Sequence, residues 1–311
     1  MSRSSVIVPH QPGRIGEVVP FAGLVKRGLA ARLWLGQSLR LETHAVIAYL
    51  AGAGHRVPVG TSVALMALRN PAEAAAQARS LAALTGHPLV AGFGASYPEL
   101  VERLTGAAPA RPATAAGEYL AAVRTLLDGG DVRGFALPPL RHPPVEVGAG
   151  VLRPGMARVA GAYADTAVTW LTPPSYVAGV LAPALRERGG NPRIVTVVHA
   201  AVTRPGRDPE HLAHLAAGAH LQAAHYTGML RTAGVDADPS DPRAGARALV
   251  RSGLFATGTP EQIAGRLAEY HAAGVDEVVV NTAGVWLAEG PHAAVRDAEE
   301  ILTCLGRGDA D

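Results

Sequence analysis

A (β/α)8 barrel of the α/β class is the fold that this 311-residue sequence predicts. Short apolar runs alternate along the chain with longer stretches that are rich in Ala and Leu. The short runs are apolar at nearly every position, which is typical of parallel strands covered on both faces. Eight such runs and a final helix favour a closed barrel over an open sheet. The first run also lacks the Gly-x-Gly-x-x-Gly that typically follows the first strand of an open nucleotide-binding sheet. We expect residues 1–311 to form one domain.

Eight strands are expected, separated by helical stretches. They cover residues 6–9, 32–36, 57–63, 89–93, 145–148, 166–171, 194–202 and 277–281. Helices are expected over residues 17–30, 43–52, 71–86, 113–127, 155–164, 175–188, 209–233, 260–273 and 292–305. The helix after Asn70 has the clearest start, because Asn is a good N-cap and Pro71 suits the first helical position. Residues 107–114 and 237–247 interrupt the alternation, and we interpret them as insertions over the barrel mouth.

The charge pattern excludes several classes of partner. Charged residues make up 17% of the chain and the formal net charge is +2, with no run of Lys and Arg. This predicts neither nucleic-acid binding nor attachment to an anionic membrane. No apolar run approaches the ~18 residues of a membrane-spanning helix, so we expect a cytoplasmic protein. We expect no metal site either, because the only closely spaced histidines, His211 and His214, have no accompanying carboxylate motif.

The carboxyl ends of barrel strands carry the active site in this fold. His10 follows the first strand and is the best candidate for a general acid or base. Gln37 follows the second strand and Tyr97 follows the fourth, and both could contact a cofactor or substrate. Small residues follow the fourth and fifth strands, where they would let the backbone approach a ligand; they are Gly92, Gly94, Ala95, Gly148, Ala149 and Gly150.

Several motifs, taken in order, resemble the luciferase-like superfamily of flavin- and deazaflavin-dependent barrels. Val59-Gly60-Thr61-Ser62-Val63, followed by Arg69-Asn70-Pro71 and a helix, resembles its third-strand signature. The fourth-strand run is similar to the Leu-Gly-Val-Gly-Ala-Gly of that family. Two later regions also match its motifs: residues 144–150 with 158–165, and Gly258-Thr259-Pro260-Glu261-Gln262 with Ala273-Gly274-Val275-Asp276. The matches span residues 6–281 in the family's order.

The resemblance implies a barrel that binds coenzyme F420 or reduced FMN at its mouth, and a homodimer. In the F420-using branch, a cis peptide bond that does not involve proline supports the deazaflavin ring at the end of the third strand. That bond would lie between Ser62 and Val63 here. The cofactor-binding residues implied in this way are Ser62, Val63, Ala64, Gly92, Gly94, Ala95, Gly148, Ala149 and Gly150.

The chain departs from the F420-dependent sugar-phosphate dehydrogenase of this superfamily at two positions. That enzyme has a His after the second strand and a Glu after the fourth, where this chain has Gln37 and Tyr97. The resemblance therefore points to an F420H2-dependent reductase with His10, Gln37 and Tyr97 as catalytic residues. Its substrate would be a small molecule or peptide with an unsaturated or carbonyl group, such as a dehydroamino acid in natural-product biosynthesis. Two alternatives stay open: an FMN-dependent luciferase-like monooxygenase and a flavin-binding barrel without catalysis.

Overall fold

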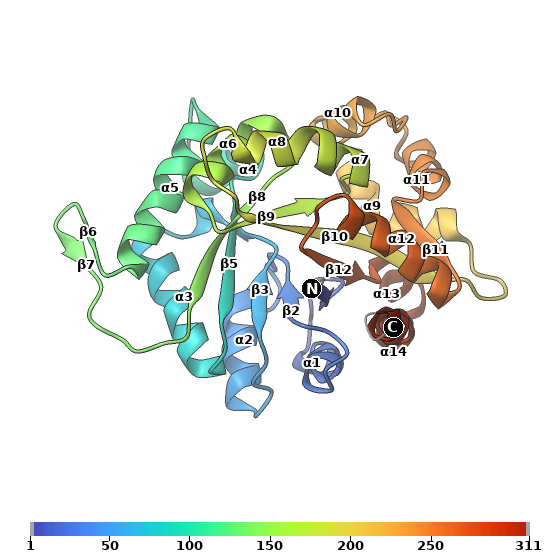
Figure 1. The fold of residues 1–311 in the computed structure, drawn as a ribbon, viewed down its shortest axis with the longest axis horizontal. Helices are drawn as coiled ribbons and strands as arrows, with labels where there is room; N and C mark the ends of the chain where they lie inside the picture. Colours follow the sequence, from blue (N-terminus) through green and yellow to red (C-terminus); the bar gives the residue numbers. More distant parts are fainter. Residues whose placement is uncertain (1–2, 309–311) are drawn as a thin grey trace.

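Eight parallel strands close into a barrel in the computed structural model, which describes residues 3–308 (Figure 1). The strands are β1 (Arg3–Ile7), β2 (Leu33–Leu35), β3 (Val59–Thr61), β5 (Leu89–Gly94), β8 (Val145–Gly150), β9 (Thr166–Trp170), β10 (Arg193–Val202) and β12 (Glu277–Asn281). They are hydrogen-bonded in this order, and β12 pairs with β1. The barrel closes because β10 pairs with both β9 and β12. The predicted fold class is confirmed, and every predicted strand overlaps an observed one.

Four short strands were not predicted, and two of them join the barrel sheet. β4 (Ala64–Leu65) pairs with the end of β5, and β11 (Phe255–Gly258) pairs with the last four residues of β10. β10 is ten residues long, and its pairs with β9 and β12 end at Val197 and His199. β11 therefore continues the sheet beyond the barrel. Its sequence, Phe-Ala-Thr-Gly, is too short and too mixed to show the apolar run on which the strand assignments rest.

Helices surround the barrel (Figure 1). They include α1 (Val19–Lys26), α2 (Thr43–Gly52), α3 (Pro71–Thr85), α5 (Pro112–Leu127), α6 (Pro154–Tyr163), α8 (Ala182–Arg186), α12 (Pro260–Ala272) and α14 (Pro291–Gly308). The start of α3 is as predicted, because the Asn70 side chain accepts a 2.9 Å hydrogen bond from the Glu73 amide. α3 ends at Gly86, which has a φ of 74°. A left-handed residue of this kind closes a helix at little steric cost only when it is glycine.

The prediction of one continuous helix over residues 209–233 is wrong. The segment forms α9 (Pro209–Leu221) and α10 (Ala224–Thr232), separated at Ala223, whose backbone is extended. The residues at the break, Gln222 and Ala223, are ordinary helix formers, so propensity gave no sign of it. The predicted insertion over residues 237–247 is partly helical, because Asp241 caps α11 (Pro242–Arg251) by accepting from the Ala244 amide.

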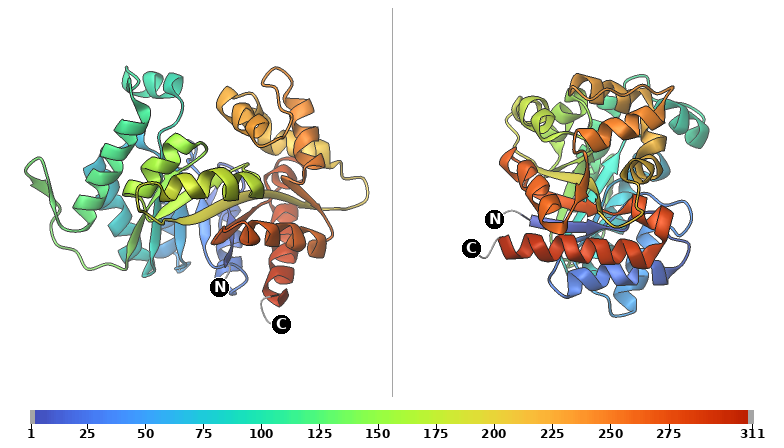
Figure 2. Two further views of the ribbon diagram at one scale, coloured as in Figure 1. Left: turned by 45° about the horizontal axis from the view of Figure 1, so that its top comes forward. Right: turned by 90° about the vertical axis from the view of Figure 1, so that its right-hand side faces the viewer.

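The remaining elements lie in the connections. α4 (Pro98–Thr105) precedes the predicted insertion at 107–114, and α13 (Ala283–Glu289) follows β12. The predicted helix over 175–188 consists of α7 (Pro174–Tyr176), a π-helical turn (Val177–Leu181) and α8. A two-stranded hairpin of β6 (Asp131–Val132) and β7 (Phe135–Ala136) projects from the side of the barrel, whereas α10 and α11 lie above one end of it (Figure 2).

One end of the barrel is closed by polar side chains around a buried carboxylate. Glu277, the first residue of β12, has no exposed surface and accepts 2.7 Å hydrogen bonds from Ser5 Oγ and Trp34 Nε1. Arg193 donates to the same carboxylate at 3.4 Å, and the Arg32 guanidinium lies 3.8 Å away. A buried carboxylate needs such partners, since an uncompensated one costs several kcal/mol. We call these five residues the polar plug.

An apolar layer fills the barrel above the polar plug. Its buried members are Ile7, Trp34, Val90, Val168, Val195, Val197 and Val279, with Val63 and Trp170 packed against them. Side chains of a strand alternate between its two faces, so Val195, Val197 and His199 of β10 share the inner face. Val279 and Asn281 of β12 do the same. The polar residues His199 and Asn281 therefore lie one step above the apolar layer: Asn281 ends β12, and His199 ends the part of β10 that pairs with β12.

No helix of residues 3–308 is both long enough and apolar enough to cross a lipid bilayer.

Candidate active site

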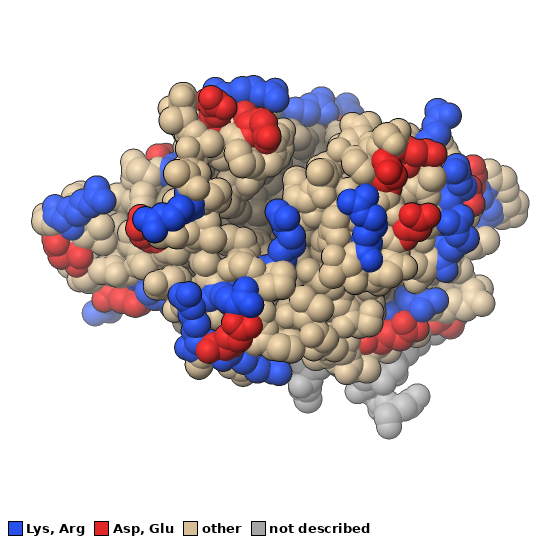
Figure 3. All heavy atoms as spheres, turned by 90° about the horizontal axis from the view of Figure 1, so that it is seen from above, with Lys and Arg blue, Asp and Glu red and all other residues tan. Residues whose placement is uncertain are grey.

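A cavity of about 810 Å³ lies at the carboxyl ends of the strands. Its volume is within the range of small-molecule and cofactor sites. Within the described part of the chain, no Asp, Glu or Lys lines it, and Arg153 is its only Arg. Seen from above in Figure 3, the molecular surface is hollowed near its centre, and charged side chains lie mainly around the hollow rather than in it. The cavity is therefore large, mostly uncharged and open on one side.

The three predicted catalytic residues all line this cavity, but in different settings. His10 lies at the open side and is exposed. Partial burial and the nearby Arg40 guanidinium lower the pKa of His10. Tyr97 precedes α4 and is 42% exposed, with its ring stacked at 6.4 Å on that of His225 from α10. His10 and Tyr97 are thus at the rim, where contact with solvent allows proton exchange.

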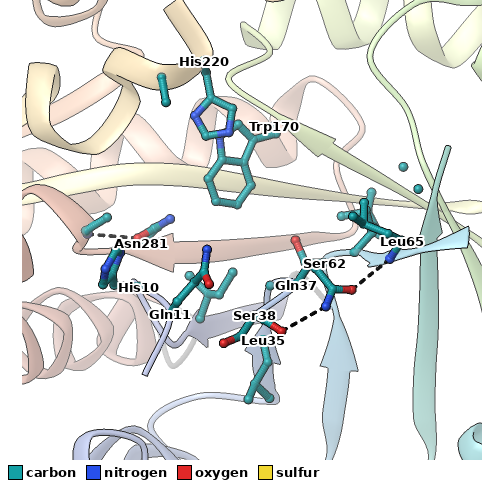
Figure 4. Close-up of a pocket in the computed structure, with 18 of the residues that line it drawn as sticks. His10, Gln11, Leu35, Gln37, Ser38, Ser62, Leu65, Trp170, His220 and Asn281 are labelled. Atoms are coloured by element: carbon teal, nitrogen blue, oxygen red, sulfur yellow. Dashed lines mark hydrogen bonds between the residues drawn. The ribbon is translucent and has the colours of Figure 1, made fainter. Parts of the chain in front are cut away.

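Both ends of the Gln37 amide are already hydrogen-bonded. Its Nε2 donates to the Ser38 carbonyl, and its Oε1 accepts from the Leu65 amide, both at 3.1 Å (Figure 4). These bonds connect the end of β2 to β4 across the base of the cavity. Gln37 keeps one Nε2 hydrogen and one Oε1 lone pair for a ligand, and its orientation is set by the protein.

The Ser62–Val63 step forms part of the cavity surface and has a cis peptide bond, where the resemblance implied one. Ser62 Oγ is buried and has no protein partner among the described residues. Val63 fits between two glycines. A Cβ on Gly94 would lie 2.5 Å from Val63 Cγ2, and a Cβ on Gly150 would lie 3.4 Å from the same atom. The two glycines therefore leave the space that the Val63 side chain fills. We call the part of the cavity surface formed by Ser62 and Val63 the floor.

The nine predicted cofactor-binding residues divide into two sets. Ser62, Val63, Gly94, Ala95 and Gly150 line the cavity, whereas Ala64, Gly92, Gly148 and Ala149 are buried and do not line it. Gly92 and Gly148 have a packing role. A Cβ on Gly92 would lie 2.1 Å from the Thr61 carbonyl oxygen, and one on Gly148 would lie 3.0 Å from Gly92 Cα. Small residues at these positions thus let strands β3, β5 and β8 approach each other closely.

Four residues that sequence reasoning had not selected form the opposite wall, which we call the His–Trp wall. Trp170, His199 and Asn281 end or nearly end β9, β10 and β12, and His220 belongs to the last turn of α9. Figure 4 shows Trp170 and His220 across the cavity from Gln37 and Ser62. The Trp170 ring lies 5.2 Å from that of His199 and 5.4 Å from that of His220. The sequence places Trp170, His199 and Asn281 near strand ends, but the same sequence pattern is equally typical of core residues at Trp170 and His199.

Polar atoms of the His–Trp wall have no hydrogen-bond partner within the described residues. These atoms are Trp170 Nε1, both ring nitrogens of His199, His220 Nδ1 and Asn281 Nδ2. Buried polar atoms are nearly always paired, so this group is unusual. Each of these atoms has less than 1 Å² of accessible surface, so their side chains line the cavity while the polar atoms themselves are covered. Asn281 Oδ1 accepts from the Ala283 amide at 3.0 Å, which sets the orientation of the amide.

The wall is electrically neutral near pH 7. Burial lowers the pKa of His199 to about 3 and that of His220 to about 4, with a smaller contribution from a neighbouring imidazole in each case. Burial also raises the pKa of Tyr226, which contacts His220 edge-on at 4.9 Å, to about 12. Among residues 3–308, no group of three His, Cys, Asp or Glu side chains could hold a metal ion.

The chain is similar in fold to enzymes that use either of two related cofactors. One is an F420-dependent secondary alcohol dehydrogenase in complex with an F420–acetone adduct. The match covers 98% of this chain and 99% of that enzyme, with a TM-score of 0.71 and 17% sequence identity. Another is the F420-dependent tetrahydromethanopterin reductase from Methanopyrus kandleri. That match covers 97% of this chain and 98% of the reductase, with a TM-score of 0.70 and 14% identity. A third is a type II Baeyer–Villiger monooxygenase from Pseudomonas putida in complex with FMN. The match covers 99% of each chain, with a TM-score of 0.68 and 15% identity.

At the level of sequence, no curated protein matches the chain. The profile of the luciferase-like monooxygenase family does match, over residues 4–277. The chain therefore belongs to the luciferase-like monooxygenase family, whose members are F420- or FMN-dependent oxidoreductases.

Proposed function

We propose that this protein is an F420H2-dependent reductase that acts on an unsaturated or carbonyl group of an uncharged small molecule or peptide. The observation that carries the proposal is the pairing of two opposed surfaces in one cavity. The floor at Ser62–Val63 could support a flat ring system, and the His–Trp wall lines the other side of the same cavity, whose volume of about 810 Å³ has room for a second ligand. A reductase needs both a cofactor and a substrate in contact with each other.

The residues present fit a deazaflavin or flavin. The floor is apolar at Val63, and the buried Ser62 hydroxyl beside it has no hydrogen-bond partner among the described residues. Arg153 immediately precedes the ten-residue helix α6 and is the only Arg of the described residues that lines the cavity. F420 and FMN both carry a phosphate on a flexible chain, and a helix start with an adjacent Arg is a good place for such a group. Arg153 would therefore hold the anionic tail.

A reduced deazaflavin, when bound, supplies a hydride to an electrophilic carbon of the substrate. The adjoining atom of the reduced double bond then needs a proton. His10 is our candidate for its source, because its imidazole is at the open side of the cavity and can be reprotonated from solvent. Tyr97, also at the rim, would position the substrate. The other lining residues orient the two ligands and exclude water.

The setting of Gln37 favours reduction over alcohol oxidation. An alcohol must lose a proton as its hydride leaves, and this requires a base. The amide of Gln37 is not a base, and no Asp or Glu of the described residues lines the cavity, so that proton could go only to a lining histidine, such as His10 at the rim. In the reductive direction the substrate gains a proton instead of losing one, so no base is needed at the position of Gln37.

The second candidate is an FMN-dependent monooxygenase, which the FMN-bound structural neighbour supports. Titration of the purified protein with F420 and FMN side by side separates the two candidates. We expect micromolar binding of F420, and anaerobic reoxidation of F420H2 by an uncharged enone or enamide. Binding of FMN but not of F420, with substrate-dependent oxygen consumption, would establish the alternative. Binding without turnover of any probe would favour a non-catalytic flavin-binding barrel.

A further inference from the structure

Five aromatic side chains follow one another along one side of the cavity, from the strand ends to the rim. In order they are Trp170, His220, Tyr226, His225 and Tyr97, and successive ring centroids lie 5.4, 4.9, 4.8 and 6.4 Å apart. All five line the cavity, and each has part of its surface exposed. Unlike the covered polar atoms of the His–Trp wall, these rings are within reach of a ligand. We call the five residues the aromatic ladder.

The break between α9 and α10 brings three of these rings together. In one continuous helix, which turns about 100° per residue, the side chains of His220, His225 and Tyr226 would point about 100° to 140° apart. The extended backbone at Ala223 changes the direction of the chain, and all three side chains line the same cavity. The aromatic ladder thus depends on the break and could not form on the face of a single helix.

The aromatic ladder lies across the cavity from the floor. In the view of Figure 4, Trp170 lies between His220 above and Ser62 below. A substrate that accepts a hydride from a ring resting on the floor must lie against the free face of that ring, with the reacting atoms in contact. Its far side then faces the aromatic ladder. A planar group is the shape that contacts both surfaces over its whole area.

The aromatic ladder is suited to an uncharged ring. Burial lowers the pKa of His220 to about 4, and burial together with the Arg153 guanidinium lowers that of His225, so both imidazoles are neutral near pH 7. No carboxylate of the described residues lines the cavity to balance a cation. Aromatic rings in offset or edge-on contact gain more than their buried area alone provides. A saturated ring of the same size gains only the burial.

We propose that the substrate carries an uncharged planar ring, aromatic or conjugated, which packs between the cofactor ring and the aromatic ladder. Trp170 is its main contact, because it is the largest of the five rings and lies at the end of β9, deepest in the cavity. This deepens the proposed function and rests on it for the hydride transfer. The ladder residues position the substrate and select planar rings over saturated ones.

Binding is tested first on the protein without cofactor. The probes are acetophenone and cyclohexyl methyl ketone, which carry the same carbonyl group on an aromatic ring and on a saturated ring of the same size. Ligand-observed NMR titration gives both dissociation constants. We expect acetophenone to bind about two- to tenfold more tightly, which is the value of one aromatic contact. Trp170→Leu should remove this preference, whereas Trp170→Phe, which keeps a ring, should retain most of it.

The kinetic test uses F420H2 with benzylideneacetone and its cyclohexyl counterpart, 4-cyclohexylbut-3-en-2-one. In each, a hydride and a proton add across the carbon–carbon double bond conjugated with the ketone, and F420H2 is oxidised to F420. The quantity compared is the ratio of the two kcat/KM values. The intrinsic reactivities of the two enones are the same for every variant, so a change in this ratio reports on the protein. We expect Trp170→Leu to lower the ratio about two- to tenfold.

Tyr226 provides an independent comparison that keeps Trp170 in place. Tyr226→Leu should lower the same ratio, whereas Tyr226→Phe should leave it unchanged, because it keeps the ring and removes only the hydroxyl group. Circular dichroism shows whether each variant is folded, and titration with F420 should give the wild-type affinity in all of them. If Trp170→Leu does not fold, the two Tyr226 variants decide the question.

The outcomes separate this inference from the proposed function. If F420 does not bind but acetophenone is preferred in a way that depends on Trp170, the aromatic ladder stands and the cofactor assignment fails. If F420H2 reduces both enones but no ladder variant changes the ratio, the ladder inference is wrong. A preference for the saturated ketone, or binding of neither ketone, also contradicts it. So does a loss of F420 affinity in Trp170→Leu without a change in the ratio, because the aromatic ladder would then bind the cofactor ring.

Discussion

Trp34 donates its indole N–H to the carboxylate of Glu277 at 2.7 Å, inside the barrel and at the end away from the cavity. Both side chains are fully buried, and Ser5 is the other close donor to Glu277. We predict that Trp34→Phe lowers the free energy of unfolding by about 2 to 4 kcal/mol, because it removes a donor from a buried charge and leaves a small void. Chemical denaturation followed by circular dichroism measures this.

The control for Trp34→Phe is Trp286→Phe, which makes the same change in ring size at a site where no buried carboxylate accepts the indole N–H. We expect a smaller loss of stability there. Equal losses in the two variants would show that the hydrogen bond to Glu277 contributes little.

The fit between Val63 and Gly94 is expected to control cofactor affinity. The Cβ of Gly94→Ala would lie 2.5 Å from Val63 Cγ2 and would displace the floor. We predict that Gly94→Ala weakens cofactor binding by about tenfold or more and costs about 1 to 3 kcal/mol of stability. Equilibrium titration of F420 and FMN measures the first effect, and thermal unfolding the second.

Truncation of Val63 provides the corresponding rescue. In Val63→Ala/Gly94→Ala the clash is gone, so stability should return toward that of Val63→Ala alone, as expected for residues in direct contact. Additive losses in the double variant would mean that Gly94 acts through something other than Val63.

Asp297 of α14 is expected to be the most sensitive carboxylate for folding outside the barrel. It is fully buried, accepts from the Val202 amide at 2.9 Å, and pairs with Arg204 at 3.0 Å and Arg207 at 2.5 Å. Asp297→Asn leaves two guanidinium groups short of a partner, and we predict a loss of about 3 to 5 kcal/mol. Glu300→Gln breaks the more exposed bridge to Arg204 and should cost at most about 1 kcal/mol. Denaturation midpoints of the two variants test the contrast.

Stability should fall on acidification because of His199 and His220. Burial lowers both pKa values below 6.5, so the unfolded chain binds protons that the folded one does not. The free energy of unfolding is therefore constant with respect to these groups above about pH 6.5. Below that it decreases with a slope of up to about 1.4 kcal/mol per pH unit for each group, until the folded pKa is reached.

The variant His199→Gln removes one of the two groups and should flatten the decline of stability between about pH 6 and pH 4. His292→Gln, at an exposed position on α14, is the control and should leave the slope unchanged. An unchanged slope in His199→Gln would contradict the assignment.

The repeating β–α pattern allowed the barrel to be predicted well. The predicted strand at residues 277–281 and the predicted helix at 43–52 have the observed bounds, because a run of apolar residues and an amphipathic run are local signals. β11 and the break between α9 and α10 were missed, since each depends on contacts with distant parts of the chain. Tertiary context decides such elements, and the local sequence carries little trace of it.

The candidate site was predictable in position but only partly in composition. Fold topology predicts that residues after the strands converge, and His10, Gln37 and Tyr97 do line one cavity. The sequence could not show that Gln37 would have both amide ends hydrogen-bonded, or that Gly92 would serve close strand packing. It also could not separate Trp170 and His199 from core residues, because an inward-facing strand residue looks the same whether the space above it is filled or open.

The polar plug and the apolar layer above it also have a consequence for the order of events in turnover. Among residues 3–308, buried side chains fill the barrel at that end, so we expect cofactor and substrate to enter and leave by the cavity mouth. If a cofactor ring rests on Ser62–Val63 as proposed, it would lie beneath whatever occupies the space up to Trp170 and His220. On that proposal we expect the cofactor to bind first and the reduced product to leave before the spent cofactor. Product-inhibition kinetics would test this ordered sequence.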